Sequence, residues 1–197
     1  MLKQIDERRS IRKYKNIPVP QDVIEEMIRA AHLAPSAKNR QPWKFIVFQN
    51  AAKDELVQVM KQGIEAEKQT HELMPEWAHA MPDAENTVRI MEQAPCLIAV
   101  INTNGYTPFA QIEKENRIVE ICDSLSIGAA IEHMILTAQE HGLGTLWIAN
   151  TCFAYNALVE YLKTDNQLTG IVAVGYPNEA PDKRPRKTID AIVEYRS

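Results

Sequence analysis

The groups best suited to bind an anion lie in two short segments that are far apart in the 197-residue sequence. They are Arg8, Arg9, Ser10 and Arg12 in the run RRSIRKY, and Arg184 and Arg186 in the run DKRPRK. Arginine presents a planar fork of donors that matches a phosphate or a carbonyl-rich heterocycle. Taken alone, each run is more typical of a solvated basic surface. We therefore assign an anion-binding role to these two runs only if further segments of the chain support it.

A loop bracketed by prolines carries hydroxyl, amide and cationic groups between an expected helix and an expected strand. It runs from Pro35 to Pro42 and includes Ser36, Ala37 and Asn39. Prolines stiffen such a loop, and its donors could grip a polar ligand. Serine and asparagine are also common turn residues, so an ordinary helix-to-strand connection explains these residues equally well.

The segment GLGTLWIAN places Trp147, Ile148 and Ala149 shortly after Gly142 and Gly144. Two glycines allow the backbone to approach a ligand closely, although Gly142 alone is better explained as the end of a helix. These glycines follow a helix, and the chain has no G-x-G-x-x-G after a strand. The segment is therefore not a Rossmann dinucleotide fingerprint.

Hydrophobic periodicity indicates the elements that must position these segments. Helices are expected at 2–9, 21–33, 51–69, 116–141 and 155–163. Strands are expected at 43–48, 96–101, 145–149, 168–176 and 189–195. Residues 70–86, which include Met74 and Trp77, show no clean period, and we expect a mobile flap or short helices there. The mixture of helices and strands predicts an α+β or α/β class.

Composition and charge restrict the class of protein further. The chain is 45% hydrophobic and 24% charged, which is typical of one globular domain spanning residues 1–197. A net charge of -4 argues against a nucleic-acid-binding protein. The three cysteines form no C-x-x-C pair, the five histidines form no metal-binding motif, and no segment resembles a signal peptide or a membrane span. We therefore expect no metal, no membrane and a cytoplasmic location.

Taken together and in this order, four segments closely resemble the nitroreductase family. The segments are RRSIRKY, APSAKNRQPW, GLGTLWI and GYPNEAPDKRPRK, and the resemblance extends from about residue 5 to residue 195. It implies an α+β fold with a mainly antiparallel central sheet flanked by helices. It also implies an intertwined homodimer that binds FMN without a covalent bond, in active sites built at the interface by both subunits.

The resemblance assigns cofactor-binding roles to residues of all four segments. The phosphate and ribityl chain would be held by Arg8, Arg9, Ser10, Arg184 and Arg186, and the N1/O2 edge of the ring by Arg12. The partner subunit would supply to the same site the loop that contains Pro35, Ser36, Ala37 and Asn39. The ring would lie against Trp147, Ile148 and Ala149. A backbone amide of the last segment would lie near flavin N5. The family often has glycine where this chain has Ala149, so a methyl group there could narrow the space beside the ring.

The implied activity is transfer of a hydride from NADH or NADPH, through flavin N5, to a nitroaromatic or quinone in a ping-pong cycle. The flavin carries this chemistry, so no side chain is predicted to act as a catalytic acid or base. Two alternatives remain open: specialised chemistry in the same fold (flavin destruction or reductive dehalogenation), and FMN storage or sensing without turnover. In the variable flap at about 61–90, Trp77 and Met74 would line the acceptor pocket or simply pack against the body of the protein.

Overall fold

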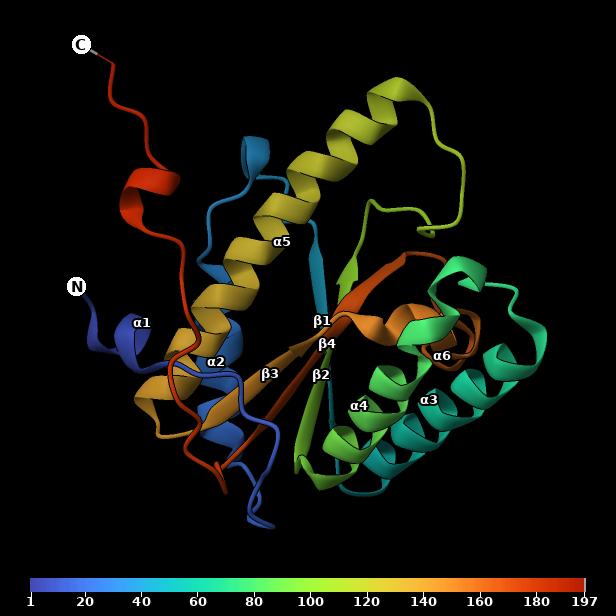
Figure 1. The fold of residues 1–197 in the computed structure, drawn as a ribbon, viewed down its shortest axis with the longest axis horizontal. Helices are drawn as coiled ribbons and strands as arrows, with labels where there is room; N and C mark the ends of the chain where they lie inside the picture. Colours follow the sequence, from blue (N-terminus) through green and yellow to red (C-terminus); the bar gives the residue numbers. More distant parts are fainter. Residues whose placement is uncertain (197) are drawn as a thin grey trace.

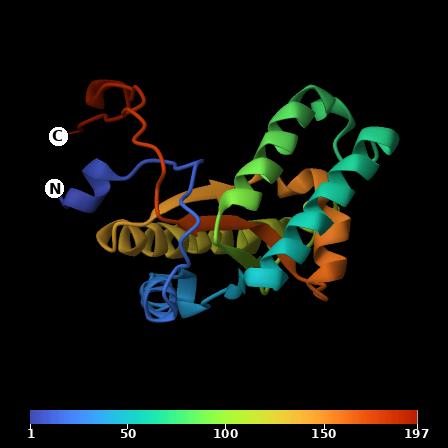
Figure 2. The same cartoon turned by 90° about the horizontal axis from the view of Figure 1, so that it is seen from below.

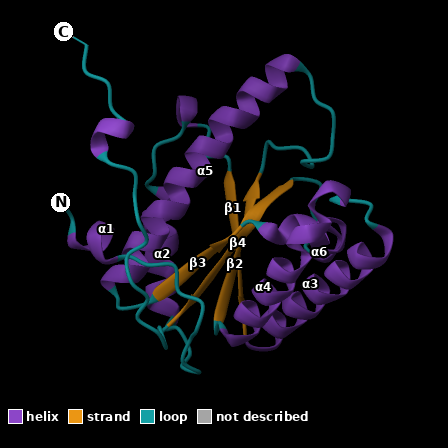
Figure 3. Cartoon of the chain, viewed as in Figure 1, coloured by secondary structure: helices purple, strands orange, loops and turns teal. Residues whose placement is uncertain are grey.

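The computed structural model describes residues 1–196 and contains a four-stranded sheet with helices on both faces (Figures 1 and 3). The strands are β1 (Trp43–Gln49), β2 (Cys96–Asn102), β3 (Gly144–Ile148) and β4 (Gln167–Gly175). Their order across the sheet is β1-β2-β4-β3, and every neighbouring pair is antiparallel. The expected α+β class with a mainly antiparallel sheet is therefore confirmed.

The two central strands separate two hydrophobic cores. All seven residues of β2 are buried, because both of its faces are covered. Its side chains alternate: Leu97 and Ala99 belong to one core, whereas Ile98 and Val100 belong to the other. A strand covered on both faces has a continuous apolar run, which is why β2 could be predicted from the sequence.

Different helices cover the two faces of the sheet (Figure 2). One face is packed by α2 (Gln21–His32) and α5 (Lys114–Glu140), with α1 (Lys3–Glu7) against α5. The other face is packed by α3 (Asn50–Thr70), α4 (Met81–Gln93) and α6 (Tyr155–Tyr161). Short 3-10 helices are η1 (Ala37–Asn39), η2 (Pro75–Ala80), η3 (Asn150–Ala154) and η4 (Ile189–Ala191). Across the described chain, no helix has the length and apolar content needed to span a membrane.

The early and late parts of the chain run side by side beside β3 (Figure 1). The Lys15 amide donates to the Tyr176 carbonyl at 2.8 Å, and the Asn178 amide donates to the Lys13 carbonyl at 2.9 Å. The Glu179 carboxylate then accepts from the Arg12 amide at 2.5 Å. These contacts bring the two arginine-rich segments to the same side of the molecule.

Of two sequence-based expectations about secondary structure, the one for residues 70–86 (a mobile flap or short helices) is met by its helical alternative, and the one for residues 189–195 is wrong. The irregular stretch expected at 70–86 contains η2 and the first part of α4, a helix of 13 residues. Pro82 lies in the first turn of α4, where proline is well tolerated because it removes no hydrogen bond. The strand expected at 189–195 is absent: η4 and non-regular backbone occupy it, and its apolar side chains are exposed. Alternating residues permit a strand but do not form one without a neighbouring edge.

Candidate active site

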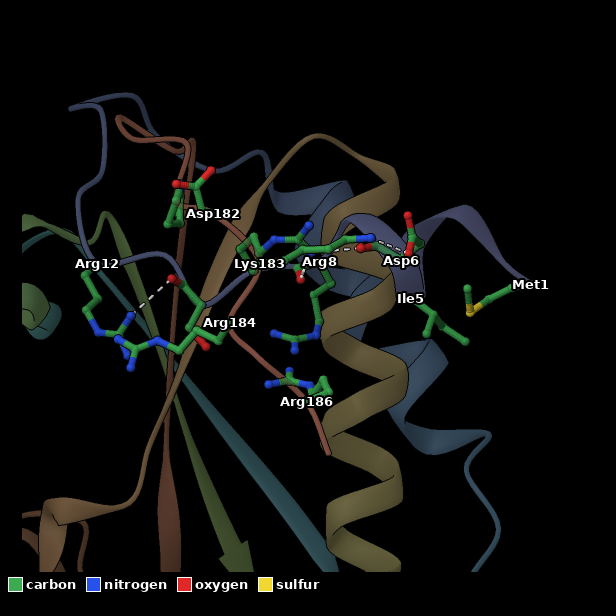
Figure 4. A pocket seen from close by; sticks show the side chains of 12 residues that line it. Met1, Ile5, Asp6, Arg8, Arg12, Asp182, Lys183, Arg184 and Arg186 are labelled. Atoms are coloured by element: carbon green, nitrogen blue, oxygen red, sulfur yellow. Dashed lines mark hydrogen bonds and ion pairs between the residues drawn. The ribbon is translucent and has the colours of Figure 1, made fainter. Parts of the chain in front are cut away.

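The two arginine-rich segments line one cavity of about 520 Å3 (Figure 4). Its lining includes the predicted residues Arg8, Arg9, Ser10, Arg12, Arg184 and Arg186, together with Met1, Ile5, Asp6, Pro181, Asp182 and Lys183. Six cationic side chains therefore face two carboxylates, in a chain whose net charge is -4. Such a concentration of guanidinium groups suits an anion with several oxygen atoms, such as a phosphate.

Hydrogen bonds and ion pairs hold the side chains around this cationic cavity. The Arg9 guanidinium donates to the Asp6 carbonyl at 2.8 Å and to the Arg8 carbonyl at 2.7 Å. Lys183 pairs with the Asp6 carboxylate at 2.6 Å. This ion pair joins α1 to the late segment, the basic residues 182–187. The hydrogen bond and charge of Lys183 hold the pKa of Asp6 below its ordinary value. Contacts within the chain therefore hold Arg9 and Lys183 at the edge of this cavity.

The edge of β3 positions the early segment, the arginine-rich residues 8–14. Ser10 forms a parallel bridge with Thr145, and the Ile11 amide donates to the Thr145 carbonyl at 2.9 Å. This close approach requires Gly144, since a Cβ atom there would lie 2.5 Å from Ile11 Cγ1. The Tyr14 hydroxyl donates to the Ile11 carbonyl at 2.7 Å, and burial raises the pKa of this phenol. The arginines therefore extend from a segment fixed on both sides.

A second pocket, of about 260 Å3, adjoins the C-terminal end of β3. It is lined by the predicted residues Arg12, Trp147, Ile148 and Ala149, together with Asp83, Asn86, Thr87, Ile90, Leu146 and Asn150. Arg12 therefore lines both hollows, that is, the cationic cavity and this second pocket. Trp147 is 45% exposed, whereas Ile148 is buried. Ala149 has φ −105° and ψ −19°, so the backbone here does not require glycine.

Sequence reasoning missed four polar residues of this second pocket. The Asn150 side-chain amide donates to Thr87 Oγ1 at 2.9 Å and to Asp83 Oδ2 at 3.2 Å, and Asn86 lies on the same stretch of α4. Asp83, Asn86 and Thr87 are three and four residues apart, which places them on one face of a helix. That spacing was a usable signal, but it has meaning only once α4 is recognised.

The proline-bracketed loop lies apart from both hollows. Pro35, Ser36, Ala37 and Asn39 line neither of them, and the loop instead rests on α5. The Ala37 amide donates to Ser126 Oγ at 3.2 Å. Within one chain, this loop therefore does not join the other predicted site residues.

The two residues expected in the acceptor pocket lie in and just before η2, and neither lines the two hollows described above. Trp77 is 56% exposed and lies 6.0 Å from the His79 ring, between ring centroids. Met74 is half-buried against the core that contains α3 and α4. Trp77 is therefore not a core residue, whereas Met74 does pack against the body of the protein.

Comparison with known proteins agrees with the arrangement of these segments. The sequence model of the Nitroreductase family matches residues 5–176. The chain belongs to the nitroreductase family. This confirms the resemblance drawn from the four sequence segments.

Relatives of this nitroreductase-family protein carry different names. It is 28% identical to the "Putative NAD(P)H nitroreductase YfhC" of Bacillus subtilis, over 94% of this chain and 88% of the relative. It is 25% identical to an iodotyrosine deiodinase of Daphnia pulex, over 98% of this chain and 65% of that protein. Among solved structures, a variant of the FMN and NADPH-dependent nitroreductase NfnB, derived from sphigopyxis sp. strain HMH, superposes with a TM-score of 0.75 at 18% identity. That match covers 98% of this chain and 96% of the other, and it establishes the shared fold.

Proposed function

We propose that this protein is an FMN-dependent oxidoreductase that passes a hydride from NADH or NADPH to a small electron acceptor, such as a nitroaromatic or a quinone. The observation that carries the proposal is the position of Arg12, which lines both the cationic cavity and the pocket beside Trp147. A ligand with an anionic tail and a flat, electron-poor ring would place its two parts in these two hollows. The names of the nitroreductase relatives point to the same chemistry.

The residues fit the chemistry of FMN. Its phosphate is close to a dianion at neutral pH, and the cationic cavity offers guanidinium donors from both segments. Arg8, Arg9 and Ser10 would hold the phosphate and ribityl chain from one side, and Arg184 and Arg186 from the other. When bound, FMN supplies the atom, N5, that accepts and then releases the hydride.

The protein's own residues would orient the ring and tune its electron affinity. Arg12 would present a cation toward the N1/O2 edge, where it favours uptake of negative charge. Trp147, Ile148 and Ala149 would form a wall against the ring. Asp83 and its neighbours on α4 border the same pocket. Because one pocket would receive both the nicotinamide and the acceptor, the two would bind in turn, as in a ping-pong cycle.

We further propose that the protein acts as a homodimer with both active sites at the interface. One face of α5 exposes Ile118, Ile121 and Leu125, with exposed fractions of 57%, 53% and 72%. Residues three, four and seven apart form one stripe of a helix, and exposed apolar stripes favour burial against a partner. The resemblance to the family assigns the loop with Ser36 and Asn39 to the site of a second copy, and the loop does lie away from the cavity in its own chain. Light scattering should give twice 22.4 kDa at low micromolar concentration.

Anaerobic stopped-flow spectroscopy tests the activity. Apo-protein should take up FMN and turn yellow, NADH or NADPH should bleach it, and a quinone or nitroaromatic should restore the colour. A yellow protein that resists bleaching would instead support storage or sensing. A protein that cannot take up FMN would refute all of these functions.

A second candidate is reductive dehalogenation, which the iodotyrosine deiodinase relative favours. The FMN-loaded, reduced protein should then release iodide from iodotyrosine. Iodide release faster than turnover of nitroaromatics and quinones would place this candidate first. Absence of iodide would exclude it.

A further inference from the structure

The loop of residues 35–41 has an unusual backbone. Lys38, Asn39 and Gln41 have φ values of 53°, 53° and 49°, in the left-handed region. Residues other than glycine rarely adopt this region, and each such residue raises the free energy of the loop. Three of them within four positions do not persist unless surrounding contacts enforce the conformation.

Asp123 on α5 makes the strongest of these contacts. Its side chain is fully buried, and Oδ1 accepts from Arg40 Nε at 2.8 Å and from Arg40 Nη2 at 2.6 Å. Its other oxygen accepts from the Asn104 side-chain amide at 3.3 Å. A buried carboxylate needs a charged, hydrogen-bonded partner. If Arg40 moved away, Asp123 would lose its only charged partner in the described residues and keep only the hydrogen bond from Asn104, so the ion pair pins the backbone between Asn39 and Gln41.

Ser126 provides a second anchor one turn along the same helix. Its hydroxyl accepts from the Ala37 amide at 3.2 Å and donates to the Cys122 carbonyl at 2.7 Å. Within the loop, Ser36 Oγ accepts from the Gln41 amide at 3.0 Å. Lys38 and Asn39 thus lie between two points, Ala37 and Arg40, that are fixed on one face of α5, and Gln41 directly follows the second point.

We propose that Asp123, acting through Arg40, is a positioning residue that holds the 35–41 loop ready to contact the cofactor bound by a second copy of the chain. This inference rests on the proposed FMN function, because the loop touches neither hollow of its own chain. If the loop is held in its binding conformation, every protein molecule is able to bind the cofactor. Releasing it lowers the competent fraction, and the apparent Kd rises in inverse proportion to that fraction.

The first test compares Asp123→Asn with wild-type protein and with a control, Glu85→Gln. The control breaks the exposed Lys68–Glu85 ion pair between α3 and α4, which leaves the loop untouched. In the apo-proteins, trypsin cleavage after Lys38 is followed by mass spectrometry. Because cleavage follows the population of open loop, Asp123→Asn should be cut about tenfold faster than the other two proteins. Equal cleavage rates would overturn the clamp.

The second measurement is the Kd for FMN, determined by fluorescence titration, with dimer mass and Tm recorded alongside. Asp123→Asn should raise the Kd by about tenfold if one loop in ten stays competent, and it should remain dimeric. Faster cleavage with an unchanged Kd would show that the loop does not serve the cofactor, which overturns the inference. Wild-type protein that takes up no FMN would instead refute the proposed function, while the cleavage rates still report on the clamp.

Ser126→Ala keeps the test decisive if Asp123→Asn does not fold. It removes the other anchor and leaves the Arg40–Asp123 pair in place. It should change the cleavage rate and the Kd in the same direction, by a smaller factor. If this variant matches wild type in both measurements, the loop is not held by its contacts with α5.

Discussion

We expect Gly144→Ala to weaken FMN binding, although residue 144 lines neither the cationic cavity nor the pocket beside Trp147. The added Cβ would lie 2.5 Å from Ile11 Cγ1, 2.8 Å from Ile11 Cβ and 3.0 Å from Ile11 Cγ2. Carbon atoms in contact are normally separated by about 3.5–4.0 Å, so Ile11 must withdraw by about 1 Å. Because its Cβ is among the clashing atoms, a rotamer change cannot relieve the clash, and the backbone must move.

The size of the rise in Kd depends on which binding residues move with the backbone of Ile11. The Ile11 amide donates to the Thr145 carbonyl at 2.9 Å, and a shift of about 1 Å takes this pair beyond hydrogen-bond distance. Ser10 and Arg12 flank Ile11 and move with it. Misplacing binding groups by about 1 Å can cost up to about a hundredfold, so we expect the Kd for FMN to rise by about 10- to 100-fold. The overpacked site should also lower the free energy of unfolding by about 1–3 kcal/mol.

Gly142→Ala is a matched control. Gly142 has φ +71°, and a Cβ there would meet no atom within 4 Å. The substitution should therefore cost about 1–2 kcal/mol of backbone strain without displacing the early segment. FMN titration and thermal unfolding of both variants separate stability from positioning. If Gly144→Ala loses stability yet binds FMN as tightly as Gly142→Ala, the proposed role of β3 in placing the arginines is wrong.

Two further substitutions test other parts of the site, and a labelling experiment tests the core. Trp77→Ala should alter kcat/KM unevenly across quinones and nitroaromatics and should cost well under the roughly 3–5 kcal/mol of a buried tryptophan, because the ring is 56% exposed; uniform scaling with a collapsed Tm would contradict this. Asp6→Asn should release Lys183 and tighten FMN binding at low salt, a gain that disappears at high ionic strength. Since the pKa of Asp6 is lowered, this ion pair is present above the carboxyl's ordinary pKa and lost as the pH falls through the lowered one, so wild-type and variant affinities should converge there in acid. Burial raises the pKa of Cys96 to about 12, so iodoacetamide at pH 8 should leave it unmodified until the protein unfolds, as peptide mass spectrometry can show.

The sequence predicted the elements that depend on burial. The continuous apolar run at Cys96–Asn102 and the alternating, aromatic-rich run at Trp43–Gln49 are strands, because each pattern reflects the number of covered faces. The long helix at Lys114–Glu140 is present for a related reason, since its second half buries Ile127, Ala130, Ile131 and Met134 in the core, although Ile118, Ile121 and Leu125 in its first half are exposed. These patterns arise within a single segment and can be detected there.

What the sequence could not predict depends on contacts between distant segments. The hydrogen bonds from Asn150 to Asp83 and Thr87 join η3 to α4, and no local pattern links them. Spacing alone also gave no reason to bring Arg12 and Arg184 into one cavity; that expectation came from resemblance to the family. The pairing of Arg40 with Asp123 across 83 positions was missed for the same reason.

The pairing of early and late segments beside β3 has a consequence for the order of synthesis. Ser10 and its neighbouring arginines leave the ribosome before any strand of the sheet, whereas Arg184 and Arg186 follow all four strands. The cationic cavity thus comes into being only after the whole sheet has been made. A nascent chain that stops at β4 would hold only the first of the two arginine-rich segments that line this cavity. Under the proposed function, the sheet must therefore fold without help from FMN until Arg186 has been made.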